Sequence, residues 1–104
     1  MGVALPIPSR KIEAFCRKWR IAEVCLFGSV LRDDFGPDSD VDVMVSFRPD
    51  ADWGLLDLAR MQEELEGIFG RNVDLLTRRG VERSHNRIRR EAILRSAEPI
   101  YAAG

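Results

Sequence analysis

The chain has 104 residues and a formal net charge of −1, and 45% of its residues are hydrophobic and 32% charged. This length suits one small domain and excludes two, so we expect a single domain over residues 1–104. No apolar run approaches the roughly 18 residues of a membrane span, and the N-terminus lacks the basic segment of a signal peptide. We therefore expect a cytoplasmic protein without membrane contact.

The predicted elements begin with a helix that has Ser9 as its N-cap. Residues 22–28 form a short apolar run that ends in Gly, which is typical of a buried strand. Residues 29–34 are compatible with a brief helical turn before a loop. The first helix has an apolar stripe at positions i, i+3, i+4 and i+7, namely Ile12, Phe15, Cys16 and Trp19.

The second half of the chain continues the alternation of strands and helices. Residues 40–47 alternate strictly, with valines and Phe47 on one face and Asp40 and Asp42 on the other. The remaining segments are a helix over 53–69 closed by Gly70, a strand over 72–76, a basic helix over 83–95 and a terminal strand or tail over 98–103. This order predicts a small α/β or α+β sheet with helices over one face.

Charge is distributed unevenly along the chain. Residues 1–70 carry 8 Lys or Arg and 13 Asp or Glu, whereas residues 71–104 carry 8 Arg and 4 acids. A basic segment is typical of a polyanion-binding site and equally of a solvated helix face, so both interpretations stay open. Cys16 and Cys25 lie in apolar segments, which favours buried free thiols over a disulfide or a zinc site.

The pair Asp40 and Asp42 is the first sign of chemistry. On one strand face their Cβ atoms lie roughly 6–7 Å apart, and two ionised carboxylates at that distance repel each other. A divalent cation between them reverses this effect, and Mg²⁺ typically takes one or two carboxylates and completes its shell with water and substrate phosphates. The pair therefore predicts half of a phosphate-bridging metal site.

Gly28 and Ser29 predict the other half of that site. A Gly at the end of a buried strand lets the backbone approach a ligand closely. The N–H groups that open the following turn, together with the Ser29 hydroxyl, can bind the phosphates of a nucleotide. Arg32, about one turn further along, is placed to neutralise their charge.

Other interpretations of these acids fit less well. Asp38 begins an EF-hand-like pattern, but its sixth position is Val43 instead of Gly and its twelfth is Pro49 instead of Glu. A Walker A loop is absent because no Lys follows the glycine. Solvent-facing acids on an exposed strand would explain the two aspartates alone, but not their spacing from the Gly-Ser pair.

Gly28-Ser29, followed after ten residues by Asp40-Val41-Asp42, resembles the signature of the DNA polymerase β-like nucleotidyltransferase superfamily. Within it, the chain is most similar to the minimal nucleotidyltransferase (MNT) domain proteins. The similarity runs through nearly the whole sequence and includes the stretches "NVDLLTRRGVE" and "IRREAIL". The resemblance implies the polymerase β-like fold, a small mixed sheet covered by helices.

The resemblance also implies the roles of the acids. Asp40 and Asp42 on one strand and Asp74 on a neighbouring strand would be the catalytic residues and would bind two Mg²⁺ ions. A hydroxyl would attack the α-phosphate of the nucleotide in line, and pyrophosphate would leave. Asp74 would help to position or deprotonate that hydroxyl.

For the nucleotide, the resemblance implies that Gly28 and Ser29 contact the β- and γ-phosphates of ATP. Arg32 and Ser39 are further candidates for nucleotide binding. Many relatives have Arg-Gly after the Gly-Ser pair, whereas here Arg32 is followed by Asp33. An acid beside the phosphate site reduces the attraction for a nucleotide unless it points outward.

The acceptor of the transferred group is expected to be a docked protein, since no second domain follows to hold it. By resemblance, the partner is a HEPN-domain RNase toxin, and the chain is an antitoxin that attaches AMP from ATP to a tyrosine of that toxin. The basic helix would face the partner, the phosphates or water, and Arg78 and Arg79 are placed nearer to the phosphates. We expect no direct contact with nucleic acid.

Two rival functions share the same fold. In one, the chain is a catalytically silent antitoxin that neutralises its toxin by binding alone. In the other, it is a stand-alone adenylyltransferase for a small molecule, which the lack of a second domain to hold that molecule disfavours. The intact set of Asp40, Asp42 and Asp74 with Ser29 favours catalysis.

Overall fold

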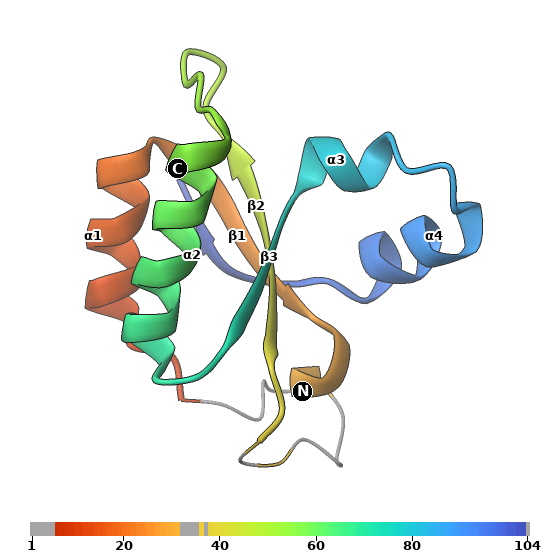
Figure 1. Ribbon diagram of the computed structural model, residues 1–104, viewed down its shortest axis with the longest axis horizontal. Coiled ribbons are helices and arrows are strands. Elements are labelled where there is room, and N and C mark those ends of the chain that lie inside the picture. The colour runs from red at the N-terminus through yellow and green to blue at the C-terminus, as the bar shows by residue number, and fades with distance from the viewer. Residues whose placement is uncertain (1–5, 32–35, 37, 104) are drawn as a thin grey trace.

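A computed structural model of the protein describes residues 6–31, 36 and 38–103. The order of elements confirms the predicted alternation, and one short helix after the third strand is additional (Figure 1). Within the described part of the chain, no helix combines the length and the apolar character needed to cross a bilayer. The elements are α1 (Ser9–Trp19), β1 (Ile21–Phe27), the 3₁₀ helix η1 (Gly28–Leu31), β2 (Val41–Phe47), α2 (Leu55–Phe69), β3 (Val73–Thr77), α3 (Arg78–Glu82), α4 (Arg87–Ser96) and β4 (Glu98–Ala102).

The four strands form one mixed sheet in the order β3-β2-β1-β4. β1 pairs antiparallel with both β2 and β4, whereas β2 and β3 are parallel. The parallel pair requires a crossover connection, and α2 provides it. The mixed sheet predicted from the sequence is therefore confirmed, with β3 and β4 as its edge strands.

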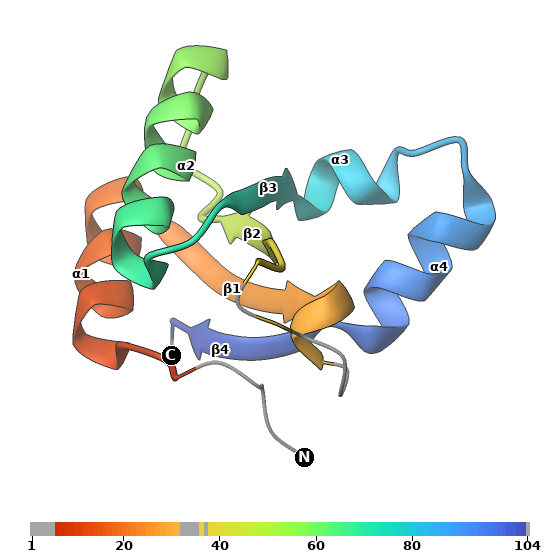
Figure 2. The same cartoon turned by 60° about the horizontal axis from the view of Figure 1, so that its bottom comes forward.

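Helices cover both faces of the sheet, so the prediction of helices over one face is wrong. Val41, Val43 and Val45 are completely buried in the core that α1 and α2 build on one face (Figure 2). On the opposite face Met44 packs in a second, smaller core under α3 and α4, together with Cys25, Phe27, Val81 and Ile93. β1 contributes Cys25 and Phe27 to this second face, which is therefore apolar there, and α3 and α4 pack against it.

Two helix ends differ from the predicted ones. Ser9 is the first residue of α1 and not its N-cap, because the carbonyl of Pro8 already accepts a hydrogen bond from Ile12 N–H at 3.0 Å. α2 begins at Leu55, after a turn in which the Asp57 carboxylate accepts a hydrogen bond from the backbone N–H of Gly54 at 3.0 Å. This contact satisfies one of the backbone N–H groups at the start of the helix.

The predicted basic helix over 83–95 starts later in the structure, where α4 spans Arg87–Ser96, and the additional helix α3 lies before the predicted span. α3 follows β3 without a loop, and the Thr77 hydroxyl caps it by accepting a hydrogen bond from Gly80 N–H at 3.0 Å. α4 begins one turn later than predicted because the side-chain oxygen of Asn86 accepts a hydrogen bond from Arg89 N–H at 3.0 Å. Asn is among the preferred N-cap residues, so this start could have been recognised in the sequence.

Both cysteines are free and buried, as predicted. Burial raises the pKa of the Cys16 thiol to about 12. Burial also raises the pKa of the Cys25 thiol to about 11, and the nearby Glu23 carboxylate adds to the increase. Neither thiol is therefore ionised near neutral pH, which excludes both as nucleophiles there.

The main core predicts a stability difference between two leucines of α2. Leu65 is completely buried, whereas Leu55 is 85% exposed. We expect Leu65→Ala to lower the free energy of unfolding by about 2–5 kcal/mol, because it removes buried methyl groups and leaves a cavity. Leu55→Ala is the control, with an expected change within about 0.5 kcal/mol. Urea denaturation of both variants measures the difference, and equal losses would contradict the assigned core.

Candidate active site

The pairing of the strands brings three of the predicted residues to one end of the sheet. Phe27 pairs with Asp42 across β1 and β2, so Gly28 follows directly beside the Asp42 position. Asp42 pairs in turn with Asp74 across the parallel strands β2 and β3. Both acids occupy the second residue of their strands, at the lower end of the sheet in Figure 1.

Position 28 is suited to glycine and to no other residue type. Its φ of +75° lies in the left-handed region, which residues other than glycine rarely adopt. A Cβ atom there would also lie 2.2 Å from Oδ2 of Asp42. The bare backbone at the end of β1 therefore makes room for the Asp42 carboxylate, which is half-buried beside it.

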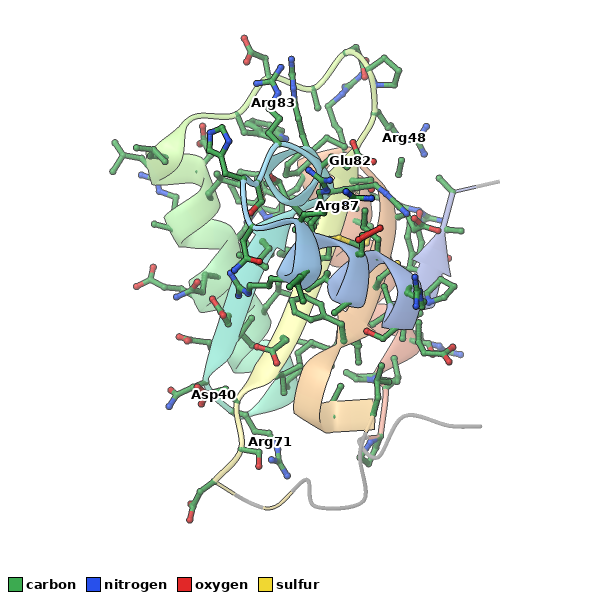
Figure 3. All side chains as sticks on the ribbon, turned by 90° about the vertical axis from the view of Figure 1, so that its right-hand side faces the viewer. Asp40, Arg48, Arg71, Glu82, Arg83 and Arg87 are labelled. Carbon is green, nitrogen blue, oxygen red and sulfur yellow. The ribbon has the colours of Figure 1, made fainter. Side chains whose placement is uncertain are left out.

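Asp40 lies in the connection that leads into β2, and Arg71 holds this connection in place. Nη1 of Arg71 donates hydrogen bonds to the carbonyl oxygens of Gly36 at 2.7 Å and Ser39 at 3.3 Å. At the start of β2, Val41 N–H donates to the carbonyl of Asn72 at 2.9 Å. Asp40 and Arg71 thus lie at the same end of the molecule (Figure 3).

The structure describes the remaining predicted nucleotide-binding residues less fully. The Ser39 hydroxyl oxygen accepts a hydrogen bond from Gly36 N–H at 3.0 Å, so it stabilises the connection before β2. Ser29 lies in η1, directly after Gly28. Arg32 lies outside the described residues. Nucleotide binding by these three residues stays a prediction.

Sequence reasoning did not identify Arg71. Its neighbours in the chain give no motif, and it follows Gly70 in what reads as an ordinary helix end. Its importance appears only from the tertiary hydrogen bonds to a segment more than 30 residues earlier in the chain. A guanidinium with several donors in a fixed geometry is well suited to such a bridge between backbone carbonyls.

Arg78 lies away from the acids, contrary to the prediction that it is placed for phosphate. It forms ion pairs with Glu23 at 3.9 Å and with Glu82 at 3.8 Å. Since Arg78 follows the C-terminal end of β3, it is separated from Asp74 by about 13 Å of strand. Figure 3 likewise shows Arg83 at the opposite end of the molecule from Asp40. These arginines therefore belong to a different surface.

The donor set fits Mg²⁺ in its chemistry. Asp40 and Asp74 are exposed and Asp42 is half-buried, and carboxylate oxygens are the ligands that this ion prefers. Among the described residues, no three His, Cys, Asp or Glu side chains already converge as ligands of one ion. The strand register places Asp42 and Asp74 side by side, and their side chains would have to rotate to bind one shared ion.

Comparison with known proteins identifies the family. The sequence matches the nucleotidyltransferase domain family over residues 9–96, and the chain belongs to this family. It is 38% identical over 68 residues to a protein of Methanocaldococcus jannaschii named "Putative protein adenylyltransferase MJ0435", a match that covers 65% of this chain and 71% of that protein.

Solved structures confirm the predicted fold class. A "putative minimal nucleotidyltransferase" is 36% identical with a TM-score of 0.67, and the match covers 88% of each chain. A toxin–antitoxin complex with AMP-PNP gives a TM-score of 0.70 at 17% identity, covering 93% of this chain and 75% of that one. The complex of tri-AMPylated Shewanella oneidensis HEPN toxin with MNT antitoxin gives 0.61 at 18% identity, covering 91% and 70%. The last two likenesses concern the fold alone.

Substitutions at three glycines distinguish the two constraints on Gly28, which are its positive φ and the nearby Asp42 carboxylate. Gly67 lies within α2 with open space around it, and Gly70 has a φ of +68° but also faces open space. We expect Gly67→Ala to stabilise the protein by about 0.5–1 kcal/mol and Gly70→Ala to destabilise it by about 1–2 kcal/mol. Gly28→Ala should cost more than Gly70→Ala, because it adds the overlap with Asp42 to the same backbone strain.

Chemical denaturation of the three variants gives the order of their unfolding free energies. Equal losses for Gly28→Ala and Gly70→Ala would show that the Asp42 carboxylate does not press against Gly28.

Proposed function

We propose that this chain is a Mg²⁺-dependent protein adenylyltransferase that transfers AMP from ATP to a tyrosine hydroxyl of a HEPN-domain toxin, and so acts as its antitoxin. The observation that carries the proposal is the register that sets Gly28, directly after β1, beside Asp42 on β2 and Asp74 on β3 at one end of the sheet. The names of the adenylyltransferase relative and of the HEPN toxin–MNT antitoxin complex support it. In this proposal residues 1–104 form a single minimal nucleotidyltransferase domain.

The triphosphate of ATP would bind beside Gly28. The backbone there carries no side chain and turns with positive φ into η1, and the N–H groups of this turn would bind phosphate oxygens. The Ser29 hydroxyl and the Arg32 guanidinium would add a neutral and a charged donor. These contacts hold the β- and γ-phosphates and leave the α-phosphate facing the acids.

Asp40, Asp42 and Asp74 would hold the Mg²⁺, which when bound supplies positive charge that neutralises the triphosphate. Asp42 is fixed between Gly28 and Asp74 by the pairing of its strand. Asp40 is fixed less directly, through the hydrogen bonds of Arg71 to the connection that precedes it. The chain thus positions its acids before any ligand binds, which lowers the cost of arranging them.

In the chemical step the tyrosine oxygen attacks the α-phosphorus of ATP in line with the bond to the β-phosphate oxygen. A new P–O bond to tyrosine forms, the old P–O bond breaks, and pyrophosphate leaves. Asp74 orients the hydroxyl and takes up its proton, which is then released to water. Asp74 suits this role because it is exposed on the edge strand β3, where a separate protein can reach it.

Substitution of Asp42 on β2, and of Asp40 just before this strand, tests the proposed AMP transfer. We expect Asp40→Asn and Asp42→Asn each to lower AMP transfer by about two to three orders of magnitude. Each removes the negative charge of a carboxylate that would hold Mg²⁺, whose positive charge stabilises the transition state. Asp52→Asn, at an exposed acid in the connection between β2 and α2, is the control and should act as wild type. The measurement uses labelled ATP, Mg²⁺ and a purified HEPN-domain toxin, and circular dichroism checks folding.

A cellular experiment separates catalysis from binding alone. If the double variant Asp40→Asn, Asp42→Asn protects cells from the toxin as well as the wild type does, the chain neutralises its partner by occlusion and the proposed enzymatic function is wrong. If it fails to protect cells while it still binds the toxin, AMP transfer is the protective activity.

Asp74 should differ from the other acids in its kinetic effect. We expect Asp74→Asn to lower the rate of AMP transfer by about a hundredfold or more while it weakens ATP binding less, because Asp74 acts on the acceptor hydroxyl. Transfer rates and the dissociation constant of a non-hydrolysable ATP analogue measure the two effects separately. Equal losses in both would assign Asp74 to the nucleotide and not to the acceptor.

A further inference from the structure

A groove of about 840 Å³ runs along β3 on the side that has no neighbouring strand. One wall is the first half of α2, and the other wall is formed by α3 and α4, with β3 between them (Figure 1). Its volume lies in the range of pockets that bind ligands and segments of other molecules. None of the residues assigned to the metal or the phosphates lines it, so this groove is a separate feature.

Two of the three large apolar side chains that the described part of the chain leaves exposed line the groove. Leu55 and Leu56 on its rim are 85% and 81% exposed. Leu76, Val81 and Ile93 continue the apolar surface toward the second core. Neighbouring exposed leucines beside a concave apolar surface mark an interaction site, because their exposure to water brings no stability.

The charged residues around the groove are mostly basic. Arg60, Arg89 and Arg90 line it, against the single acid Glu63. Arg90 is held in place by a hydrogen bond from its Nη1 to the carbonyl of Ser84 at 3.1 Å. A partner that fits this surface therefore combines apolar side chains with acidic ones.

The backbone along the groove is suited to pairing with an extended chain. At the start of β3 the Val73 N–H points away from β2 and donates to the Glu66 carboxylate at 3.2 Å. Because the hydrogen-bonding direction alternates along a strand, the N–H and C=O groups of Leu75 point the same way, into the groove. An extended segment laid there can form main-chain hydrogen bonds as a fifth strand.

The groove also continues directly from the candidate active site. Asp74 immediately precedes the lining residues Leu75 and Leu76 on β3. Asp74 and Leu76 face the same side of the sheet, with Cα atoms roughly 7 Å apart. A segment bound beside Leu76 therefore reaches the acids within a few residues of its own length.

We propose that this groove docks the acceptor protein, which inserts an extended segment of apolar and acidic residues along β3 and so presents its hydroxyl to Asp74. The inference rests on the proposed function, since that function defines the acceptor. It assigns the recognition of the partner to α2, β3 and α4, and it leaves the Gly28 end of the sheet to the nucleotide. Affinity for the partner is then set by residues that take no part in the chemistry.

Leu56→Asp is the variant that tests the groove, and Ile88→Asp is its matched control. Each residue is the second of its helix, and each is more than 80% exposed, but only Leu56 lines the groove. An acid in the first turn of a helix is compatible with folding in both cases. Titration calorimetry with a purified HEPN-domain toxin measures affinity, and labelled ATP measures AMP transfer.

We expect Leu56→Asp to weaken binding by about tenfold or more, because it puts a charge where an apolar contact with the partner is expected, and to slow AMP transfer at low partner concentration. Ile88→Asp should match the wild type in both measurements, and both variants should bind the ATP analogue as the wild type does. Arg89→Glu should weaken the same interaction through repulsion of the acidic segment.

Three results would overturn the docking proposal. Unchanged affinity in Leu56→Asp would place the partner elsewhere while the proposed function stands. A dimer that Leu56→Asp dissociates, seen by sedimentation, would assign the groove to a second copy of this chain. No binding of the HEPN-domain toxin by the wild type would remove the proposed function as well. Binding that Leu56→Asp weakens, without AMP transfer by the wild type, would remove the enzymatic function and the presentation of a hydroxyl to Asp74, and would leave the groove as a binding surface alone.

Discussion

The contact between Gly28 and the Asp42 carboxylate is the constraint on which the candidate site depends. A side chain at residue 28 would overlap Oδ2 of Asp42, so the end of β1 must be bare if the acid is to occupy its place beside Asp74. Positive φ at the same residue lets the chain turn directly from β1 into η1. One bare position thus makes room for the carboxylate and begins the turn at which we propose that the phosphates of a nucleotide bind.

The sequence contained enough information to find the strands and the acids, because both depend on short-range patterns. The alternation of residues 40–47 indicated which face of β2 carries Asp42, whereas Asp40 lies just before the strand, and the Gly-Ser pair at its fixed spacing indicated the partner strand. The pairing of Asp42 with Asp74 shows that β3 lies beside β2, as expected for the strand of the third acid. The family match and the minimal nucleotidyltransferase structure agree with the resemblance on which these roles were based.

The features that sequence reasoning missed depend on contacts between distant segments. Arg71 could not be recognised because its hydrogen bonds reach the connection before β2, and nothing in its local sequence marks it. Arg78 was misplaced because proximity in the chain suggested proximity to Asp74, whereas an extended strand carries it away toward Glu23. The second core under α3 and α4 was missed because Met44 sits on the face that carries the acids, and that face was taken as polar.

The position of β3 at the edge of the sheet has a consequence for how the protein loses activity. Asp74 is placed beside Asp42 through the pairing of β3 with β2, and β3 follows β2 in the chain only after the long connection through α2. Edge elements with one neighbour open locally at a lower free-energy cost than central strands do. Detachment of this single strand would separate Asp74 from the other acids while the β1–β2 pair and α1 remain folded, so local opening of an edge strand would end activity before the core unfolds.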